Sequence, residues 1–285
     1  MGCVARLSSP ARDLNDEKPN GLLNLTLDLN LLMLNFISII FGAIVGSFLN
    51  VCICRIPKGE SIIFPGSHCP HCQRSIPFYD NIPLVSYLVL RAKCRYCQGS
   101  ISLQYPLVEG VTALSSLLLF SQFGVSWSYF FYFSFLASLI VITVIDLFHQ
   151  IIPDVISLPG IGVGLIASFI LPQLTFSNSL IGILLGGGSL FLVATFYQWL
   201  FKREGMGGGD VKLLAMIGAF LGWKAVILTI LLGSLIGSII GVIVMMLKGK
   251  DLKYAIPFGP FLSLGAALSL FHGETIITWY LHFNK

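Results

Sequence analysis

Long apolar segments recur along this chain and are separated by shorter polar ones. A helix that crosses the hydrocarbon core of a bilayer needs about 20 mostly apolar residues. Measured against that length, the sequence predicts eight membrane-spanning helices, at residues 29–51, 106–125, 127–145, 154–171, 180–201, 211–222, 225–247 and 256–271. The sixth is the shortest of them. The expected fold is therefore an all-α polytopic membrane protein.

The polar segments divide the chain into four predicted regions. Residues 1–28 form a polar tail, 29–51 the first spanning helix, 52–105 a hydrophilic Cys-rich loop, and 106–285 a membrane-embedded region. The tail is not followed by a short apolar core with a small-residue cleavage site, so no cleavable signal peptide is expected. Glycines at 186–188 and at 233, 237 and 241 are expected to allow close packing of helices.

Composition supports the membrane assignment and excludes other classes of protein. Hydrophobic residues make up 55% of the chain and charged residues only 11%, with a mean hydropathy of +0.87. Soluble domains have about 25% charged residues, so neither a disordered chain nor an ordinary soluble domain is expected. The net charge of +4 is too small to indicate nucleic-acid binding.

The positions of the basic residues predict the orientation of the chain. If the first helix runs from outside to inside, most of the 17 Lys and Arg residues fall in inner segments. Basic residues concentrate in cytoplasmic loops of membrane proteins. The Cys-rich loop is therefore expected in the cytoplasm and both termini outside.

Two acidic residues stand at the inner ends of predicted helices. Asp146 ends the apolar run 138–145, and Asp210 follows the Gly-rich segment 205–209 and opens the next helix. A carboxylate at membrane depth is costly and usually functional. Two carboxylates brought together there share one proton, so one can take a proton from water while the other hydrogen-bonds a substrate carbonyl. We therefore predict that Asp146 and Asp210 catalyse peptide hydrolysis.

The acidic residues near helix ends also have structural interpretations. Asp210 is suited to cap its helix, and Asp146 to a water-facing rim. Asp154 is expected chiefly to cap the helix that it begins, and it is the reserve candidate for a carboxylate partner. Glu109 is expected to favour the start of a helix, and Glu204 to be an ordinary loop charge.

The hydrophilic loop contains two C-x-x-C pairs, which are Cys69 with Cys72 and Cys94 with Cys97. Four thiolates at this spacing are typical of a structural, tetrahedral zinc site in a reducing compartment. Such a site would fold a loop that is too short to build its own core. His68 and His71 are not needed as ligands, and redox exchange between the pairs is the alternative.

Several segments together resemble the type IV prepilin leader peptidases, which are intramembrane aspartic proteases with a Gly-x-Gly-Asp motif. The resemblance covers almost the whole chain after the tail. Ile152 and Ala92 depart from it, where family members usually have Leu and often have Gly. The matching segments are 46–51 with Arg55 and Pro57, the cysteine pairs with 80–83 between them, 105–109, Ile145-Asp146, Pro153-Asp154, 205–213 and 257–261.

The resemblance implies a bifunctional enzyme of the bacterial inner membrane. It would cleave the basic leader from type IV prepilins and pilin-like type II secretion subunits, after a Gly and on the cytoplasmic side. It would then methylate the new N-terminal residue with S-adenosylmethionine. By motif match, the protease carboxylates are Asp146 and Asp210. No nucleotide-binding motif identifies the methyl-donor site, which is expected near the loop and residues 46–55.

Two other classes of function remain open from the residues alone. A proton-coupled transporter would use Asp146 and Asp210 as proton relays, but it would be expected to have deeper carboxylates and repeated halves. A non-enzymatic zinc-binding scaffold of a secretion apparatus would leave both aspartates without a role.

Overall fold

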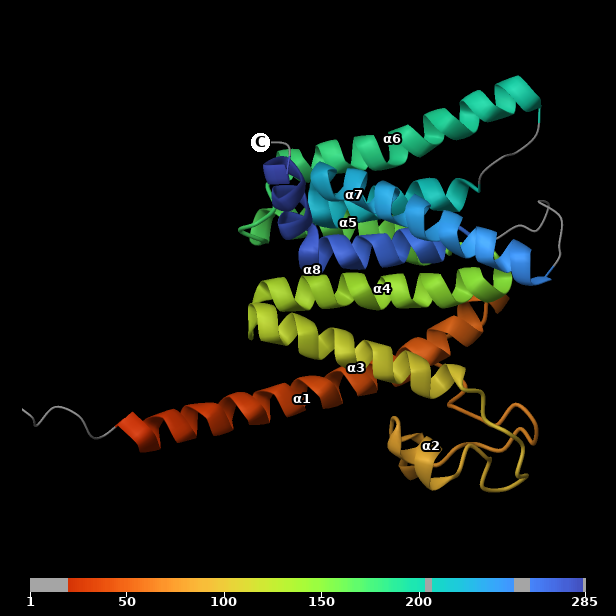
Figure 1. Ribbon diagram of the computed structural model, residues 1–285. Helices are drawn as coiled ribbons and strands as arrows, with labels where there is room; N and C mark the ends of the chain where they lie inside the picture. The colour runs from red at the N-terminus through yellow and green to blue at the C-terminus, as the bar shows by residue number, and fades with distance from the viewer. Residues whose placement is uncertain (1–19, 203–206, 249–256, 284–285) are drawn as a thin grey trace, which may run out of the picture.

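The computed structural model describes residues 20–202, 207–248 and 257–283, and this part of the chain is almost entirely helical (Figure 1). Glu204 and part of the glycine-rich segment lie outside the described residues. The long helices are α1 (Asn20–Arg55), α3 (Gln104–Phe123), α4 (Trp127–His149), α5 (Asp154–Ile170), α6 (Phe176–Phe201), α7 (Gly208–Lys248) and α8 (Gly259–Phe283).

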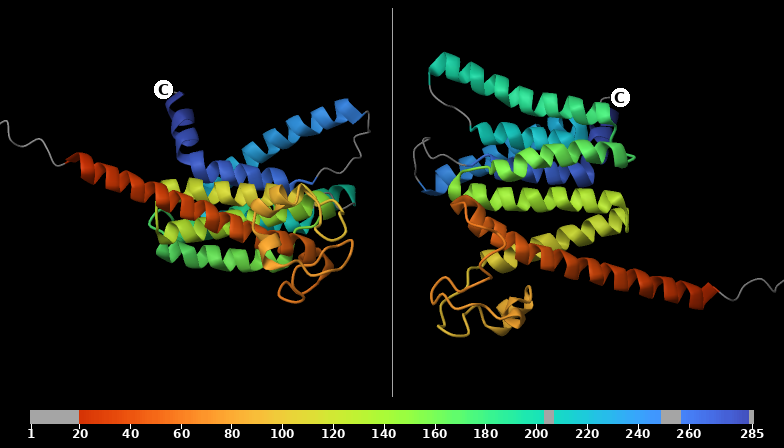
Figure 2. Two further views of the ribbon diagram at one scale, coloured as in Figure 1. Left: turned by 90° about the horizontal axis from the view of Figure 1, so that it is seen from below. Right: turned by 180° about the vertical axis from the view of Figure 1, so that it is seen from behind.

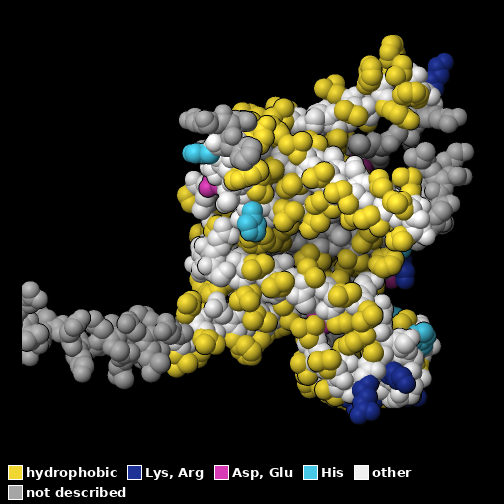
Figure 3. All heavy atoms as spheres, viewed as in Figure 1, with side chains coloured by type: hydrophobic (Ala, Val, Ile, Leu, Met, Phe, Trp, Pro, Cys, Tyr) yellow, Lys and Arg dark blue, Asp and Glu magenta, His cyan; other side chains and the backbone are white. Residues whose placement is uncertain are grey.

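The membrane assignment is confirmed by the lengths and hydropathy of these helices. Among the described residues, α1, α3, α4, α6, α7 and α8 are long and apolar enough to cross a membrane, and α5 is a shorter apolar helix. Helix α1 begins at Asn20, earlier than the expected start of the first span at residue 29. Apolar side chains cover much of the bundle surface, whereas Lys and Arg gather at the end that carries the loop (Figure 3).

Helix α7 consists of two segments that meet at Gly222. As one straight helix, its 41 residues would extend about 60 Å, about twice the thickness of the hydrocarbon core. At Gly222 the backbone has φ 77° and ψ 175°, a conformation essentially restricted to glycine, and the chain reverses direction there (Figure 1). The break lies where the predicted sixth span ends, so the two halves of α7 correspond to the predicted sixth and seventh spans.

Glycines allow α6 and α7 to pack backbone against backbone. A Cβ atom at Gly182 would lie 2.3 Å from the carbonyl oxygen of Gly218, and one at Gly186 would lie 2.4 Å from that of Leu214. Gly186 therefore has the packing role expected of the glycines at 186–188. Gly188 does not, because a Cβ atom there would meet no atom within 4 Å. Close approach of this kind is how helices associate in lipid, where water does not drive them together.

The bundle is layered, with α4 in its middle between α3 and α1 on one side and α8, α5, α7 and α6 on the other (Figures 1 and 2). Phe135 of α4 stacks on Phe220 of α7 with ring centroids 4.8 Å apart, and both side chains are buried. The last turns of α1 and α4 and the first turns of α7 and α8 lie at one end, next to the loop between α1 and α3 (Figure 1). This arrangement brings the predicted functional residues to the same end of the molecule.

Candidate active site and metal centre

Asp146 is held at the end of α4 by the first residue of α8. Its side chain is buried, with 5% of the residue exposed. The backbone N–H of Gly259 donates a hydrogen bond to Asp146 Oδ2 at 3.1 Å. The N-terminus of a helix carries unpaired N–H groups and a partial positive charge, which together favour a bound carboxylate.

Asp210 comes to the same place from α7. It is the third residue of that helix and is half-buried, and its backbone N–H donates to the carbonyl oxygen of Gly207 at 3.2 Å. Gly209, the residue before Asp210, and Gly259, which contacts Asp146, both pack against Ile152, so the two carboxylates belong to one neighbourhood and influence each other electrostatically. The fold thus brings together the two aspartates that the sequence analysis paired, although a complete helical hairpin separates them in the chain.

Two glycines make the close approach around these carboxylates possible. A Cβ atom at Gly259 would lie 2.5 Å from Asp146 Oδ2, and one at Gly209 would lie 2.8 Å from the Cβ of Ile152. Ile152 also lies 3.3 Å from the same Gly259 position, so it contacts both glycines. The sequence analysis matched Gly259 to a family segment and gave it no role. Gly259 lies inside the last predicted span, and no local signal in the sequence distinguishes it.

Asp154 does not cap α5, contrary to the expectation from its position. The N-cap residue is Pro153, and no side-chain cap is formed. Both carboxylate oxygens of Asp154 instead accept hydrogen bonds from Lys212 Nζ at 2.7 Å, in an exposed ion pair. Asp154 therefore joins the start of α5 to the start of α7.

Glu109 does not favour a helix start, because α3 begins at Gln104 and has no acidic residue in its first turn. The residue is buried, with 7% exposed, and its Oε2 accepts a hydrogen bond from the backbone N–H of Leu84 at 2.8 Å. Its carboxylate also interacts with the hydroxyl of Ser47 on α1. Glu109 therefore connects α3 to both α1 and the loop.

The four cysteines of the loop form one cluster. Their Sγ atoms all lie within 4.8 Å of one another, and those of Cys69 and Cys97 are 3.8 Å apart. The sequence C-x-x-C-Q-x-S occurs twice and forms the same turn twice: Gln73 N–H donates to Cys69 O at 2.9 Å, and Gln98 N–H to Cys94 O at 3.0 Å. Four sulfur atoms in this arrangement fit one tetrahedral metal ion.

The charge state of Cys94 also suits metal binding. Hydrogen bonds from the backbone of Cys97 and Tyr96 lower the pKa of Cys94 to about 6, so its thiolate form is favoured near neutral pH. Neither neighbouring histidine belongs to the cluster. His68 Nδ1 lies 3.2 Å from Gly66 O, and the ring of His71 packs against Gly99.

Arg55 fixes the start of the loop, a role that the sequence analysis did not assign. It is the last residue of α1 and is buried, with 8% exposed. Its guanidinium donates to the carbonyl oxygens of Ser61 at 2.9 Å, Pro65 at 2.6 Å and Gly66 at 3.3 Å. One charged side chain thus organises a turn of backbone that has few apolar contacts of its own.

Comparison with known proteins agrees with this architecture. Residues 40–123 match the model of the bacterial peptidase A24 N-terminal domain, and residues 133–242 match that of the type IV leader peptidase family. The first match includes all four clustered cysteines, and the second includes both aspartates. No solved structure gives a significant match.

Similar curated proteins extend the match over most of the chain. A prepilin leader peptidase/N-methyltransferase of Pseudomonas aeruginosa is 38% identical, over 86% of this chain and 93% of its own length. Proteins of the same description from Stutzerimonas stutzeri and Aeromonas hydrophila are 36% and 35% identical, over 87% and 85% of this chain and 94% and 92% of their own lengths. The chain therefore belongs to the type IV leader peptidase family.

Proposed function

We propose that the protein is a membrane aspartic endopeptidase that removes the basic leader from type IV prepilins and pilin-like type II secretion subunits. The observation that carries this proposal is the meeting of Asp146 and Asp210 at one end of the bundle, beside the first N–H of α8. The names of the relatives support the same activity.

The geometry suggests a role for each carboxylate. Because the Gly259 N–H donates to Asp146, we assign Asp146 as the carboxylate that removes a proton from the attacking water. Asp210, in its protonated form, donates a hydrogen bond to the substrate carbonyl oxygen, and Asp146 then gives the proton that it took from water to the leaving amine. Gly207 and Gly208, where a Cβ atom would meet nothing closer than 3.9 Å, leave room beside Asp210 for an extended peptide backbone.

The depth and side of the site fit such a substrate. A prepilin has a basic leader followed by an apolar helix, so its cleavage point after Gly lies at the inner face of the membrane. Asp146 lies in the last turn of α4 and Asp210 in the first turn of α7, at the end of the bundle next to the basic loop (Figure 1). We therefore place the protein in the bacterial inner membrane with the site in the cytoplasm and both termini outside.

Two bound groups complete the proposal. Cys69, Cys72, Cys94 and Cys97 hold a structural Zn²⁺, which orders the loop and does not take part in hydrolysis. S-adenosylmethionine supplies the methyl group for the new N-terminal amine, in agreement with the names of the relatives.

Replacing either aspartate tests the peptidase assignment. We expect Asp146→Asn and Asp210→Asn each to lower the rate of prepilin cleavage by about 10²–10⁴-fold, the usual contribution of a general acid or base. Glu274→Gln is the matched control, because Glu274 is an exposed carboxylate on α8. Normal cleavage by either folded aspartate variant would remove that residue from the mechanism, and a transporter or a scaffold would show no cleavage at all.

A further inference from the structure

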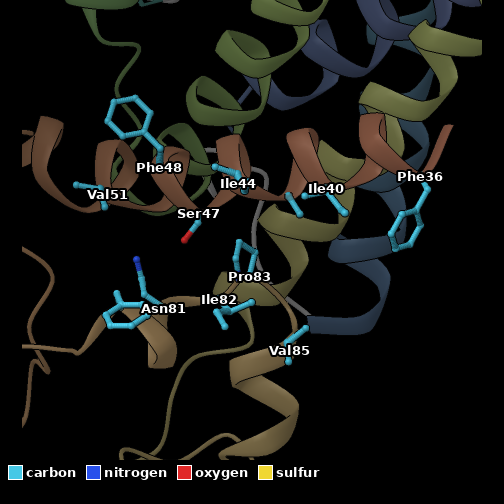
Figure 4. A pocket seen from close by; sticks show the side chains of 12 residues that line it. Phe36, Ile40, Ile44, Ser47, Phe48, Val51, Asn81, Ile82, Pro83 and Val85 are labelled. Carbon is cyan, nitrogen blue, oxygen red and sulfur yellow. The ribbon is translucent and has the colours of Figure 1, made fainter. Parts of the chain in front are cut away.

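A cavity of about 710 Å³ lies between α1 and the loop segment 78–85 (Figure 4). Of the 12 described residues that line it, only Ser47 and Asn81 are polar, and none is charged. The lining residues of α1 recur at every fourth position from Phe36 to Phe48, so they form one face of that helix. The cavity is therefore an apolar space between a membrane-spanning helix and the Cys-rich loop.

This cavity lies at the depth of the hydrocarbon core. Between Asp28 and Arg55, α1 has no charged residue, and the core takes up about 20 residues of a helix. Every stretch of that length between the two charges includes residues 35–48. The α1 wall from Phe36 to Phe48 is therefore inside the core, wherever along α1 the boundary of the membrane falls.

The loop follows α1 into this depth. Asn81 faces Ser47 near the end of α1 that leads into the loop, and Val85 lies farther along, beside Ile40 (Figure 4). Ile40 precedes Ser47 by seven residues, or about 10 Å along the helix. The chain from Asn81 to Val85 therefore runs beside α1 toward the middle of the membrane.

Segment 81–90 has the composition of a membrane-inserted element. It contains no charged residue, whereas Asp80 and Arg91 stand directly before and after it. The carboxylate of Asp80 accepts two hydrogen bonds from the Arg95 guanidinium, at 2.7 and 2.5 Å. The charges thus stay at the ends of the segment, as expected where a chain enters and leaves hydrocarbon, because charged groups there are costly.

The apolar side chains of segment 81–90 are exposed as a group. Leu88 is 74% exposed and Val89 is 70% exposed, and the short helix α2 (Val85–Val89) has no buried residue. Hydrophobic side chains cover the side of the loop toward the N-terminal part of α1, and Lys and Arg lie away from that side (Figure 3). An apolar surface of this kind is unfavourable in water and marks a contact with a partner or a membrane.

The backbone at the inner end of the segment is suited to hydrocarbon, where an unpaired N–H group is costly. Pro83 has no N–H, and the N–H of Leu84 donates to Glu109 Oε2 at 2.8 Å. The next two N–H groups donate to the carbonyl oxygens of Pro83 at 2.6 Å and of Ile82 at 3.0 Å. Glu109, a buried carboxylate on the spanning helix α3, thus supplies an acceptor where the chain turns, at the positive φ of 61° of Leu84.

We propose that segment 81–90 inserts into the leaflet on the side of the loop, and that an acyl chain of a phospholipid fills the cavity between this segment and α1. The occupant is a lipid because the cavity is at hydrocarbon depth, is continuous with the lipid-facing side of a spanning helix, and has no charged residue in its lining. Ser47 and Asn81 face one another across one end (Figure 4), where they can donate hydrogen bonds to the ester carbonyls of the lipid. The Cys-rich loop is then anchored in the membrane.

Photolabelling of the full-length protein in nanodiscs tests the insertion. The nanodiscs contain phosphatidylethanolamine and phosphatidylglycerol with a diazirine in the acyl chain, and a parallel sample receives a water-soluble diazirine. Mass spectrometry gives the ratio of acyl-chain to water-soluble adducts at each residue. We expect this ratio at Leu88 and Val89 to be at least about fivefold higher than at Glu60, an exposed residue of the polar turn after α1. A smaller difference overturns the insertion.

Cavity-filling substitutions test the occupant. Ile40→Trp and Ile44→Trp each place a large ring in the cavity, and Leu32→Trp is the matched control, because Leu32 is exposed on α1 outside the lining. Native mass spectrometry of the detergent-extracted protein is expected to show a retained phospholipid in the wild type and the control. In both cavity variants, we expect the retained phospholipid to fall by at least about fivefold.

Each outcome of this second experiment decides what occupies the cavity. Wild-type protein without a retained phospholipid overturns the proposal, as does an unchanged lipid signal in either folded cavity variant. A retained peptide, or a dimer of this chain that both variants abolish, overturns it in favour of a substrate helix or a second copy. Neither experiment measures cleavage, so failure of this inference is distinct from failure of the proposed peptidase.

Discussion

The two candidate functional regions of this protein are built in opposite ways. The aspartates are held by closely packed helix ends, where Gly209 and Gly259 leave room for Ile152 and Asp146. The Cys-rich loop has short helices without buried residues, and a few polar links hold it to the bundle. Direct packing fixes the first region, and charges together with a proposed metal ion fix the second.

Because the two regions are held differently, we expect substitutions in the bundle and in the loop to have different effects. A substitution in the bundle is transmitted by contact, so its effect depends on the free space around the side chain. A substitution in the loop acts through a small number of strong links, so losing one of them affects the whole loop. The experiments below test this separation, beginning with the largest expected effect.

Removing the metal is expected to have the largest effect, and to be confined to the loop. Structural zinc contributes about 10–16 kcal/mol of apparent binding free energy in small zinc domains, far more than this loop gains from burial. Chelation or Cys72→Ser should therefore expose the loop to proteases, as measured by limited proteolysis and mass spectrometry beside metal analysis. Cys54→Ser is the control, because its sulfur lies outside the cluster. Purified protein without metal would contradict the site.

Gly259→Ala is expected to lower the rate of prepilin cleavage by about 10²-fold or more, a loss typical of a misplaced catalytic group. The new Cβ would lie 2.5 Å from Asp146 Oδ2, so the carboxylate would have to move. Gly188→Ala is the matched control, since its Cβ would meet no atom within 4 Å. If the Gly259→Ala variant cleaves prepilin at the normal rate, close packing at Gly259 does not position the Asp146 carboxylate.

Gly222→Ala should destabilise the bundle by about 1–3 kcal/mol, because φ 77° and ψ 175° are strained for any residue with a Cβ. Thermal unfolding in detergent, with residual cleavage measured at low temperature, checks this. We expect a lower unfolding temperature with the loop's metal content unchanged. A loss of metal before the bundle unfolds would show that the two regions are more tightly coupled than we infer.

Asp154→Asn is expected to have the smallest effect. The pair with Lys212 is exposed, and exposed ion pairs contribute about 0.2–1 kcal/mol. Cleavage should stay within about twofold of wild type, compared at equal amounts of folded protein. A much larger loss of activity would make Asp154 part of the catalytic site, which is the alternative role that the sequence analysis gave it.

The sequence by itself determined the helices, their approximate ends, the position of both aspartates at helix ends, and the four-cysteine cluster. These features depend on local quantities: hydropathy over about 20 residues, and the spacing of side chains within one turn. The break of α7 near Gly222 could also be predicted from the sequence, because an apolar segment as long as α7 does not fit a bilayer as a single span.

Only the tertiary structure decided which groups from distant helices touch. Nothing local to Gly259 indicates that its N–H faces Asp146, or that Glu109 binds Leu84 and Asp154 binds Lys212. The cavity beside α1 likewise exists only because the loop folds back over that helix. Contacts of this kind follow from how helices and loops pack in space, which depends on all their side chains at once and on none of them alone.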